Sequence, residues 1–441
     1  MTIATIATIA IILAAGKSSR MKSDKSKVLH KIGHRSLIGH VLALTEQAVV
    51  VVSPESKDIQ EEVLKSFPGT TFAIQDPPLG TGHAVKTGFD TLPEIGENIL
   101  ILYGDTPLLT KETIDQLLAS NAHCTLLAME PRNPDGYGRI VQDIQGNVLR
   151  IVEHNDASLQ ERDIQLCFGG AMVIKAELLK TFLPKIENHN AKKEYYLVTL
   201  VELLSHAGHS VSYITTDEEE LMGVNDRSQL AAAEHVFQTR MRNKALQAGV
   251  TLCDPTSTYF AYDTVLESDV TLEPHVYFGP GVRVKKGASI RAFSHIEGAE
   301  IGENCAIGPF ARIRPKTILE PSSKVGNFVE IKNAHLKSGS KVNHLSYIGD
   351  ATVGKKTNIG AGTITCNYDG FHKHQTIIGD DVSIGANSSL VAPLIIEDAA
   401  LIGAGSVITK NVSKGSMALE RGIQKEIQGG ATHYRRKRSK D

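Results

Sequence analysis

The sequence predicts an α/β domain followed by an all-β solenoid, and three observations support this fold class. Residues 1–227 alternate short apolar β-rich runs with helical patterns, which is typical of a mostly parallel sheet with helices on both faces. Residues 228–249 are helical and charged, and they predict a linker helix. From about Val250 to Val412, apolar residues recur every six positions, the period of a hexapeptide β-helix. The last region, residues 250–441, therefore combines this β-helix with a basic tail.

Within the first domain, apolar runs and amphipathic stretches alternate in chain order. The predicted strands are Ile9–Ala14, Val49–Val52, Phe72–Ile74, Ile99–Tyr103 and Cys124–Ala128. The predicted helices are Leu37–Leu44, Asp58–Phe67, His83–Thr91 and Glu112–Ser120. Because ligands of such sheets bind beyond the carboxyl ends of the strands, we expect functional residues there.

The segment LAAGKSSRMKSDKSKVL follows the first predicted strand and is rich in basic residues. Gly16 and the two serines permit a tight turn whose backbone N–H groups face phosphate, and Arg20 and Lys27 add positive charge. Neither a Walker loop nor a dinucleotide-binding glycine motif is present. Taken alone, such a loop is most simply a solvated basic loop.

The order Leu-Ala-Ala-Gly…Arg-Met…Lys-Val-Leu resembles the signature of the sugar-nucleotide pyrophosphorylases, with Ser18 where that family usually has glycine. Two further segments fit. Gln75 and the stretch LGTGH at 79–83 resemble the uracil-recognising segment, and Asp105 ends the apolar strand ILILYGD. The alternative for Asp105 is a cap for the helix that begins near Thr110.

The six-residue period of the solenoid is clearest near its end. Its apolar anchors are Ile378, Ile384, Leu390, Ile396, Ile402 and Ile408, without a slip. A helix would repeat its apolar positions at steps of three and four, and a half-buried strand at steps of two. The same ladder runs upstream from Leu266 to Ile331, with one slip of a residue after Ile296. We therefore expect the anchors to stack inside a coil of short strands.

One segment, TITCNYDGFHKHQT, interrupts the ladder between Ile359 and Ile378. A loop expelled from a solenoid marks a functional face. Polar residues gather in register around it: Arg314, Lys332, His344, Tyr347, Asn358, Asn367, Tyr368 and Lys373. Each alone is most simply a surface residue, but together they predict a second active site.

The strings RIRP, VEIKNA, NHLSYIGDA, NIGAGTITCNYDG and HKHQTIIGDD resemble the bifunctional N-acetylglucosamine-1-phosphate uridyltransferase / glucosamine-1-phosphate N-acetyltransferase family. The resemblance covers nearly the whole chain. It implies a Rossmann-like nucleotidyltransferase domain followed by a left-handed parallel β-helix that forms a homotrimer. It also implies two reactions, acetyl transfer from acetyl-CoA to glucosamine-1-phosphate and then Mg²⁺-dependent uridylyl transfer from UTP, which releases pyrophosphate.

For the uridylyl step, the resemblance implies a set of contacts with UTP or the UDP-sugar. They are Leu13, Ala14, Ala15, Gly16, Arg20, Lys27, Gln75, Gly80, Thr81, Tyr103, Gly104, Asp105, Gly138, Glu153 and Asn225. Asp105 and Asn225 are the implied Mg²⁺ ligands, since Mg²⁺ takes few hard oxygen ligands from a protein. No side-chain nucleophile is needed, because alignment of the substrates and neutralisation of charge by Mg²⁺, Arg20 and Lys27 suffice.

The predicted sugar-binding part of this site departs from the family at Phe168. In the segment LCFGGAMVI, Phe168 stands where relatives usually show an asparagine that hydrogen-bonds the sugar. We expect a weakened hold on N-acetylglucosamine-1-phosphate.

For the acetyl step, the resemblance implies that His344 is the general base, because imidazole has a pKa near the operating pH. The alternative is a histidine that fixes a turn of the solenoid. Arg314, Lys332 and Lys373 are the implied clamp for the sugar phosphate, and Tyr347 and Asn358 are implied to bind the sugar. The implied acetyl-CoA contacts are Ala361, Asn367, Tyr368, Ala386, Ala404 and Arg421, with alanine at 386 where the family often has serine.

Composition and charge exclude several other classes. The net charge of −2 over 441 residues gives no general attraction to nucleic acid or anionic membrane. The five cysteines are scattered and form no Cys-x-x-Cys pair, which favours a reducing cytoplasm. Neither a signal peptide nor a membrane span is predicted. The tail RRKRSK is interpreted as solvated or near the anionic cofactor at the trimer interface.

Three hypotheses remain open at this point. The first is a two-site enzyme that makes UDP-N-acetylglucosamine for the cell envelope. The second is a single-site nucleotidyltransferase whose solenoid serves assembly, and the third is a regulatory subunit with a decayed transferase domain. His344 and the CNYDG string disfavour the second, and intact Lys27, Asp105 and Asn225 disfavour the third.

Overall fold

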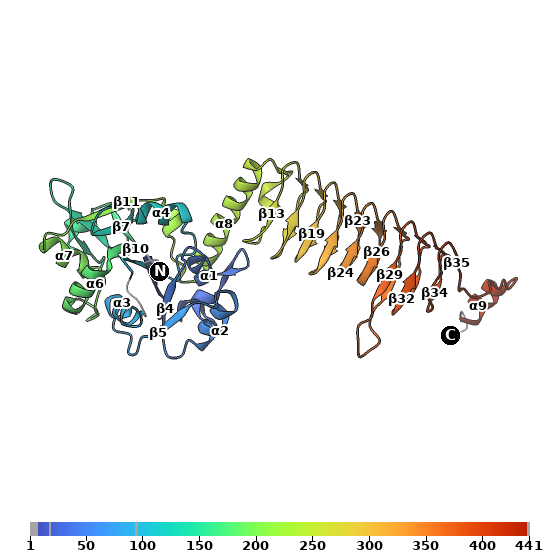
Figure 1. Cartoon of the computed structure of the whole chain (residues 1–441), viewed down its shortest axis with the longest axis horizontal. Coiled ribbons are helices and arrows are strands. Elements are labelled where there is room, and N and C mark those ends of the chain that lie inside the picture. The colour runs from blue at the N-terminus through green and yellow to red at the C-terminus, as the bar shows by residue number, and fades with distance from the viewer. Residues whose placement is uncertain (1–7, 17–18, 93–95, 439–441) are drawn as a thin grey trace, which may run out of the picture. The chain divides into compact units, whose positions relative to one another are not determined.

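In the computed structural model, which describes residues 8–16, 19–92 and 96–438, the chain divides into residues 1–240 and 241–441 (Figure 1). The expectations for the leading residues, for Ser18 and for the last three residues of the tail lie outside the described residues. Helix α8, Arg227–Gln247, spans the division, in the stretch where a linker helix is predicted. The predicted domain boundaries themselves stay a prediction.

A nine-stranded sheet organises the first unit. Its strand order is β11 (Val211–Thr215), β7 (Cys124–Met129), β10 (Cys167–Lys175), β6 (Asn98–Tyr103), β1 (Thr8–Leu13), β4 (Ala48–Val52) and β5 (Thr71–Ile74). Strand β10 runs antiparallel to both of its neighbours, and the other pairs along this path are parallel. Strands β8 (Arg139–Gln142) and β9 (Val148–Val152) form an antiparallel hairpin beside β10. A small hairpin joins β2 (Lys31–Ile32) to β3 (Arg35–Ser36).

Both faces of the central strands β1, β4 and β6 are buried, which explains why these strands are almost continuously apolar. Alternate residues of β1, such as Ile11 and Ile12, belong to two different core clusters because successive side chains point to opposite faces. The cluster with Ile11 contains residues of α3 (Thr81–Asp90), α6 (Ala176–Phe182) and α7 (Thr199–His206). The cluster with Ile12 contains residues of α1 (Leu37–Leu42), α2 (Lys57–Ser66) and α4 (Lys111–Leu118). The predicted mostly parallel sheet with helices on both faces is confirmed.

The second unit is a parallel β-helix whose strands form three sides. The first side holds β12 (Thr251–Leu252), β14 (Thr271–Leu272), β17 (Ser289–Ile290), β20 (Ala306–Ile307), β23 (Lys324–Asn327), β25 (Lys341–His344), β27 (Asn358–Ile359), β30 (Ser383–Ile384), β33 (Leu401–Ile402) and β35 (Met417–Ala418). The second holds β15 (Tyr277–Phe278), β18 (His295–Ile296), β21 (Arg312–Ile313), β28 (Ile364–Cys366), β31 (Ser389–Val391) and β34 (Val407–Ile408). The third holds β13 (Val265–Leu266), β16 (Arg283–Val284), β19 (Ala299–Ile301), β22 (Thr317–Leu319), β29 (Thr376–Ile378) and β32 (Leu394–Ile396). Strands β24 (Glu330–Leu336) and β26 (Tyr347–Val353) each pair on both the second and the third side.

The predicted anchors form one continuous core along the coil. Every predicted anchor from Leu272 to Ile408 is buried, and Leu266 packs partly buried against the same core. The ladder also passes through Leu336, Val342, Ile348, Val353 and Ile359, which joins its two predicted parts. The steps from Ile331 to Leu336 and from Ile348 to Val353 are five residues long, because β24 and β26 turn a corner there.

The interruption is narrower than its sequence suggests. Ile364–Cys366 form β28, and the buried Thr363 and Thr365 belong to the coil. Only residues 367–375 leave it, and an antiparallel bridge between Tyr368 and Lys373 closes this loop. The loop projects from the coil in Figure 1.

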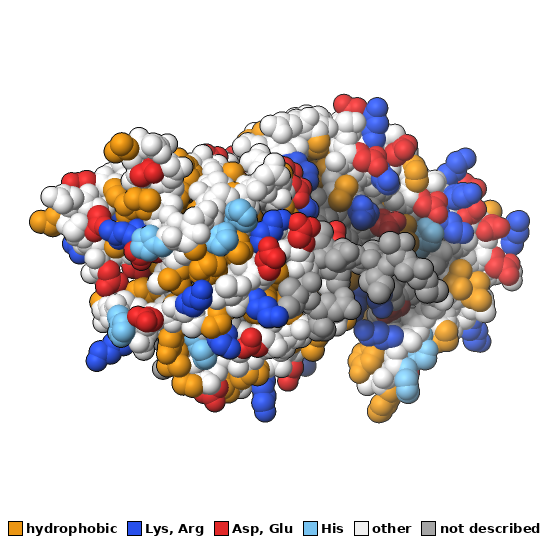
Figure 2. Space-filling model, turned by 60° about the vertical axis from the view of Figure 1, so that its left-hand side comes forward, with side chains coloured by type: hydrophobic (Ala, Val, Ile, Leu, Met, Phe, Trp, Pro, Cys, Tyr) orange, Lys and Arg blue, Asp and Glu red, His pale blue; other side chains and the backbone are white. Residues whose placement is uncertain are grey.

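Acidic and basic side chains are interspersed over the face of the molecule shown in Figure 2. Among the described residues, no helix has the length and apolar character needed to cross a bilayer. The tail contains a short helix, α9 (Gly430–Arg438).

Candidate active sites

The first candidate site is a cavity of about 240 Å³ beyond the carboxyl ends of β1 and β6. It is lined by Leu13, Ala14, Ala15, Gly16, Lys27, Val28, Gln75, Pro78, Gly80, Thr81, Ala84, Tyr103, Asp105 and Glu194. Ten of the predicted nucleotide contacts are therefore brought together at the edge where parallel sheets bind ligands.

The other predicted contacts of this site lie around the cavity. The amide of Gly104 donates to the carbonyl of Leu13 at 2.9 Å, which ties the two strand ends together. Gly138 is buried, and a side chain there would lie 3.9 Å from the Glu153 carboxylate. Arg20 is exposed on the short helix that follows the first loop.

Three segments far apart in sequence meet at Lys27. Its Nζ donates to Asp105 Oδ2 at 2.5 Å and to Asn225 Oδ1 at 2.9 Å. The backbone supports this arrangement, since the amide of Val224 donates to the carbonyl of Asp105 at 2.9 Å. Val224 is buried in a small cluster with Ala233 of α8. The two oxygens predicted to hold Mg²⁺ thus converge on one cationic group.

The helix-cap alternative for Asp105 is wrong. The hydroxyl of Thr110 accepts from the amide of Thr113 and caps α4 itself. Asp105 is thereby left to face Lys27 and the cavity.

The predicted uracil segment is held by a stretch that the sequence reasoning missed. Gln75 Nε2 donates to the carbonyl of Gly80 at 3.0 Å. The amide of Gly82 donates to the carbonyl of Tyr195 at 2.7 Å, and the amide of Tyr195 donates to the carbonyl of Leu79 at 2.8 Å. A side chain at Gly80, whose φ is +109°, would approach the Tyr195 carbonyl to 2.8 Å, so this position requires glycine. Glu194 lies beside this contact, and no motif marks the run KKEYYL in the sequence.

Two of the predicted contacts with the UDP-sugar, Tyr103 and Glu153, have raised pKa values. Burial raises the pKa of the Tyr103 hydroxyl, and the nearby Glu153 and Asp105 carboxylates raise it further. This hydroxyl therefore stays protonated and can donate a hydrogen bond. Burial also raises the pKa of Glu153, with a smaller contribution from Asp156.

Phe168 lies in β10, directly beside Gly138, one of the predicted contacts with the UDP-sugar. Its amide donates to the carbonyl of Gly138 at 2.8 Å. The ring is 8% exposed and belongs to the core cluster that contains Ile140 and Ile151. The phenyl ring is thus packed among apolar side chains, and its effect on sugar binding stays a prediction.

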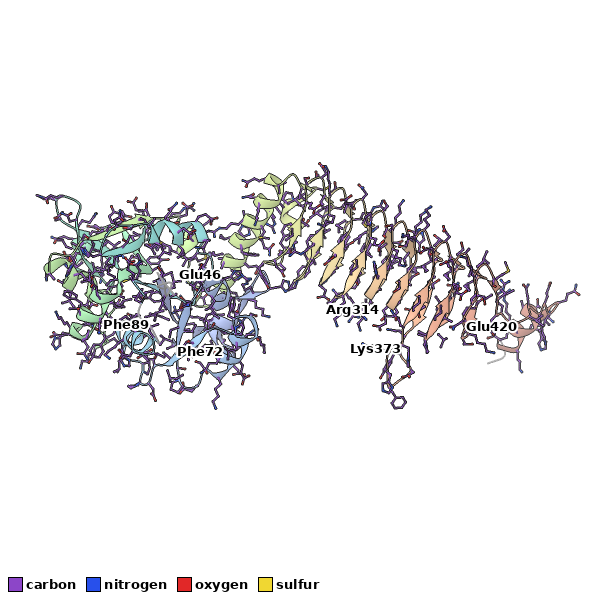
Figure 3. All side chains as sticks on the ribbon, in the orientation of Figure 1. Glu46, Phe72, Phe89, Arg314, Lys373 and Glu420 are labelled. Carbon is purple, nitrogen blue, oxygen red and sulfur yellow. The ribbon has the colours of Figure 1, made fainter. Side chains whose placement is uncertain are left out.

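The second candidate site contains three cationic side chains from different elements. Arg314 follows β21, Lys332 lies in β24, and Lys373 lies in the loop 367–375. The neighbouring Lys373 ammonium lowers the pKa of Lys332, and the Arg314 guanidinium lowers it further. Figure 3 shows Arg314 and Lys373 on the same side of the coil. Arg314 also forms an ion pair with Glu330 at 2.7 Å. The crowding of like charges creates a place where an anion is stabilised.

His344 is exposed at the end of β25, and its Nδ1 lies 2.9 Å from Asn327 Oδ1 of the neighbouring coil. Because an amide oxygen only accepts hydrogen bonds, Nδ1 is the donor in this contact, and Nε2 is the acceptor nitrogen of the corresponding neutral tautomer. The ring is thereby oriented as a base. The turn-fixing alternative rests on the same contact.

The predicted acetyl-CoA contacts follow His344 along one corner of the coil. The carbonyl of His344 accepts from Gly362, the carbonyl of Ala361 accepts from Asn387 at 2.7 Å, and the carbonyl of Ala386 accepts from Gly405 at 2.8 Å. Ala361, Ala386 and Ala404 therefore form a column of small side chains. The Arg421 side chain lies close to the end of this column, since a Cβ at Gly405 would be 3.8 Å from Arg421 Cδ.

The predicted sugar contacts Tyr347 and Asn358 begin two other strands. Tyr347 starts β26, and its hydroxyl would lie 2.3 Å from a side chain at Gly349, so the ring covers that glycine. Asn358 starts β27 and is exposed.

The loop 367–375 is braced by residues that the sequence reasoning did not single out. Asp369 accepts from the amides of Phe371 at 2.8 Å and His372 at 2.6 Å and from His374 Nε2 at 2.7 Å, which holds its pKa well below the usual range. Asp350 accepts from Asn367 at the base of the loop.

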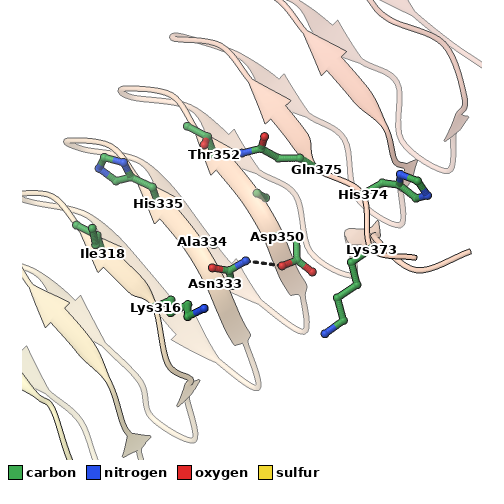
Figure 4. A pocket seen from close by; sticks show the side chains of 11 residues that line it. Lys316, Ile318, Asn333, Ala334, His335, Asp350, Thr352, Lys373, His374 and Gln375 are labelled. Carbon is green, nitrogen blue, oxygen red and sulfur yellow. Dashed lines mark hydrogen bonds between the residues drawn. The ribbon is translucent and has the colours of Figure 1, made fainter. Parts of the chain in front are cut away.

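A cavity of about 330 Å³ lies beside the base of the loop, as Figure 4 shows. Asn333 Nδ2 donates to Asp350 Oδ1 at 2.5 Å within it, and Lys373 lines its edge. In the sequence, nothing marks Asp350 and Asp369 as structural residues except their position in the strings NHLSYIGDA and NIGAGTITCNYDG.

The chain matches two protein-family models and is similar to several known proteins. Residues 10–164 match the MobA-like NTP transferase domain, and residues 297–396 match the GMPPB C-terminal domain. The chain is 46% identical over 427 residues to the "Bifunctional protein GlmU" of Paracoccus denitrificans, covering 96% of both chains. It is 45% identical to the protein of that name from Sphingopyxis alaskensis, covering 96% of both, and 44% identical to that of Zymomonas mobilis, covering 98% of both.

The fold and the two sites define a nucleotidyltransferase joined to a hexapeptide-repeat acyltransferase. The chain belongs to the GlmU family of bifunctional uridyltransferases and N-acetyltransferases. It is a bifunctional transferase that makes UDP-N-acetylglucosamine for cell-wall biogenesis, by acetyl transfer to glucosamine-1-phosphate and then uridylyl transfer to the product. The first of the three hypotheses is thereby selected.

Proposed function

We propose that the two steps are divided between the two regions of the chain, with uridylyl transfer in residues 1–227 and acetyl transfer in residues 250–441. The observation that carries this proposal is the cluster of three cationic side chains, Arg314, Lys332 and Lys373, which lie close enough on the coil to lower the pKa of Lys332. A solenoid used only for assembly has no need for such a cluster. The nucleotide cavity of the first unit supports the other half of the division.

For the uridylyl step, the residues present fit Mg²⁺. Asp105 and Asn225 offer two hard oxygens that converge on one cationic position, and Mg²⁺ completes its shell with water and phosphate oxygens. The described residues hold no group of three or more His, Cys, Asp or Glu suited to a metal, which agrees with a site completed by the substrate. When bound, Mg²⁺ supplies positive charge at the transferring phosphate.

The remaining residues of this site align the substrates. The backbone at Gly16, together with Arg20 and Lys27, holds the triphosphate, while Gln75 and Gly80 read the edge of the uracil. The Tyr103 hydroxyl and the Glu153 carboxylate face the sugar. A phosphate oxygen of N-acetylglucosamine-1-phosphate then attacks the α-phosphorus of UTP, and pyrophosphate leaves.

For the acetyl step, His344 Nε2 takes the proton that the amine of glucosamine-1-phosphate loses as it attacks the thioester of acetyl-CoA. The carbon–sulfur bond of the thioester breaks as the amide bond forms, and CoA leaves. Arg314, Lys332 and Lys373 hold the phosphate, and Tyr347 and Asn358 hold the sugar. The cofactor lies along the column of small side chains that follows His344. Its contacts are Ala361, Asn367, Tyr368, Ala386, Ala404 and Arg421. Alanine at 386 provides no hydroxyl for a hydrogen bond.

We also propose that the chain works as a homotrimer in the cytoplasm. An exposed aromatic ridge on the coil supports the assembly. Phe293, Phe310 and Phe328 are 51%, 46% and 55% exposed, and their rings stack at 4.9 and 5.2 Å. Their φ angles lie between +55° and +60°, a conformation that such residues rarely adopt. A second copy covers this apolar ridge, which ends at Leu345 beside His344.

The test follows the two products separately. A fragment of residues 250–441 and a fragment of residues 1–227 are each supplied with glucosamine-1-phosphate, N-acetylglucosamine-1-phosphate, acetyl-CoA, UTP and Mg²⁺. We expect the first fragment to release CoA alone and the second to release pyrophosphate alone, since the coil has its own core. If the coil fragment forms trimers but releases no CoA, the solenoid is an assembly module.

A further inference from the structure

Lys27 occupies the place where the proposed metal ligands meet. Its ammonium lies 2.5 Å from the carboxylate of Asp105 and 2.9 Å from the side-chain oxygen of Asn225. The Lys27 side chain is 13% exposed and that of Asp105 is 20% exposed, so water screens this contact only in part. The two oxygens thus already hold a cation that belongs to the chain.

A metal ion and this ammonium exclude each other from that place. A ligated Mg²⁺ lies about 2.1 Å from each oxygen, close to the position that the ammonium now fills. Two cations at such a separation repel strongly in a partly buried site. Either the ammonium moves or the metal does not bind.

We propose that the Lys27 ammonium is a built-in counter-ion of the metal site, which the divalent cation displaces on binding. This inference rests on the proposed function, in which Asp105 and Asn225 hold Mg²⁺. Lys27 also lines the nucleotide cavity, together with Gly16. The displaced ammonium therefore turns toward the triphosphate, and the arrival of the metal delivers a second positive charge to the substrate.

The exchange has a consequence for the empty enzyme. Asp105 is never left as an unpaired carboxylate inside the cavity, because a buried charge without a partner is costly. The same contact weakens the affinity of the site for the free metal, because the two hydrogen bonds of Lys27 to Asp105 and Asn225 must break each time the metal binds.

The experiment measures binding of Mn²⁺, a hard divalent probe for Mg²⁺, to the full chain without nucleotide, from the electron paramagnetic resonance signal of the free ion. Lys27→Met removes the ammonium. Arg20→Met is the matched control, because it removes one positive charge from the same loop region without a contact to Asp105 or Asn225. Circular dichroism melting establishes that each variant is folded, and Lys27→Gln replaces Lys27→Met if the latter is not.

We expect Lys27→Met to bind Mn²⁺ about tenfold or more tightly than the parent, and Arg20→Met to differ from the parent by less than about twofold. Adding Asp105→Asn to Lys27→Met should abolish the gain. We also expect Mg²⁺ to raise the melting temperature of Lys27→Met more than that of the parent.

Other outcomes overturn the proposal in distinguishable ways. Equal gains for Lys27→Met and Arg20→Met indicate a general effect of charge and not an exchange. Binding that depends on Asp105 but is unchanged by Lys27→Met removes the counter-ion role and leaves the metal site standing. Binding that does not depend on Asp105 in any variant removes the metal site and the exchange together.

Discussion

The two candidate sites differ in how their charges are balanced. In the first unit, Lys27 is paired with Asp105 and Asn225, so the empty site already holds opposite charges together. On the coil, Lys332 is crowded by Lys373 and Arg314, and the pKa of Lys332 is lowered by them. The first site is therefore suited to exchange one cation for another, whereas the second is suited to receive an anion.

The two sites also differ in their support. The first is assembled from loops that follow strands of one sheet, and those loops are held by contacts such as the one between Gly82 and Tyr195. The second is built on coils that stack in register, so that Asn327 and His344 occupy equivalent positions on neighbouring coils. We expect single substitutions on the coil to act locally, because each coil is supported by its neighbours.

The largest expected effect concerns His344. His344→Ala should lower acetyl transfer by about 10²–10⁴-fold, the contribution of a positioned base, and leave uridylyl transfer unchanged. CoA and pyrophosphate release from the same preparation measure the two steps. Asn327→Ala, which removes only the orienting acceptor, should lower acetyl transfer by less. Equal acetylation by His344→Ala and the parent would make the turn-fixing alternative correct.

The phosphate clamp should give the next largest effect. Lys373→Met should raise the KM for glucosamine-1-phosphate by about ten- to hundredfold, because a hydrogen bond to a charged group is lost. Lys324→Met, an exposed lysine on another strand of the coil, is the matched control. Added salt should raise the KM of the parent more than that of Lys373→Met. A KM insensitive to both changes would remove Lys373 from the clamp.

The pH dependence of the clamp sharpens this test. The like charge of Lys373 disfavours the charged form of Lys332 and lowers its pKa, so the free enzyme loses this charge at a lower pH than an isolated lysine does. Substrate binding should therefore weaken as the pH rises through that lowered pKa. In Lys373→Met the alkaline limb of kcat/KM should shift to higher pH. An alkaline limb that does not shift in Lys373→Met would show that Lys373 does not neighbour Lys332 in solution.

The aromatic ridge offers a smaller effect on assembly. Phe310→Lys should weaken association of the chains by about thirtyfold or more, because an aromatic anchor of an interface is replaced by a charge. Sedimentation at several protein concentrations measures the association. Val265→Lys, which changes another exposed apolar residue of the coil, serves as the control. If only Val265→Lys dissociates the assembly, the ridge is not the interface.

Much of this architecture could be predicted from the sequence, for physical reasons that differ between the units. The anchors from Leu272 to Ile408 were predictable because each coil places a residue in the same buried column, and that residue must be apolar. Strands such as β6 were predictable because burial on both faces leaves them continuously apolar. The short length of the loop 367–375 was not predictable, because the coil continues through Thr363 and Thr365, which are buried although they are polar.

The site residues divide in the same way. Lys27 and Asp105 each stand in a recognisable motif after an apolar strand. Their hydrogen bond joins segments 78 residues apart, and no repeat in the sequence indicates that the two residues meet. Glu194 lies in an irregular segment where neither period nor motif constrains the sequence. Asp369 stands in the string CNYDG, but the backbone amides that it binds within its loop are not visible in any sequence pattern. Strand β10 and its antiparallel direction were not predicted at all, although Phe168 lies in it.

The smallest expected effect concerns this same Phe168, the departure from the family in the predicted sugar-binding part of the first site. A phenyl ring offers no hydrogen bond to the sugar, and a polar group left unpaired in a closed site costs about 1–3 kcal/mol. We therefore expect Phe168→Asn to raise kcat/KM for N-acetylglucosamine-1-phosphate, by about fivefold at the lower end of that range.

The structure adds an opposing effect, and both can be measured. The Phe168 ring is 8% exposed within the core cluster, so its removal should lower the free energy of unfolding by about 3–5 kcal/mol. Phe168→Leu is the matched control, because it disturbs the core without adding a hydrogen-bonding group. A gain in kcat/KM for Phe168→Asn but not for Phe168→Leu shows that the sugar lacks a partner in the parent. No gain in either variant shows that another group near Gly138 holds the sugar while the ring packs beneath it.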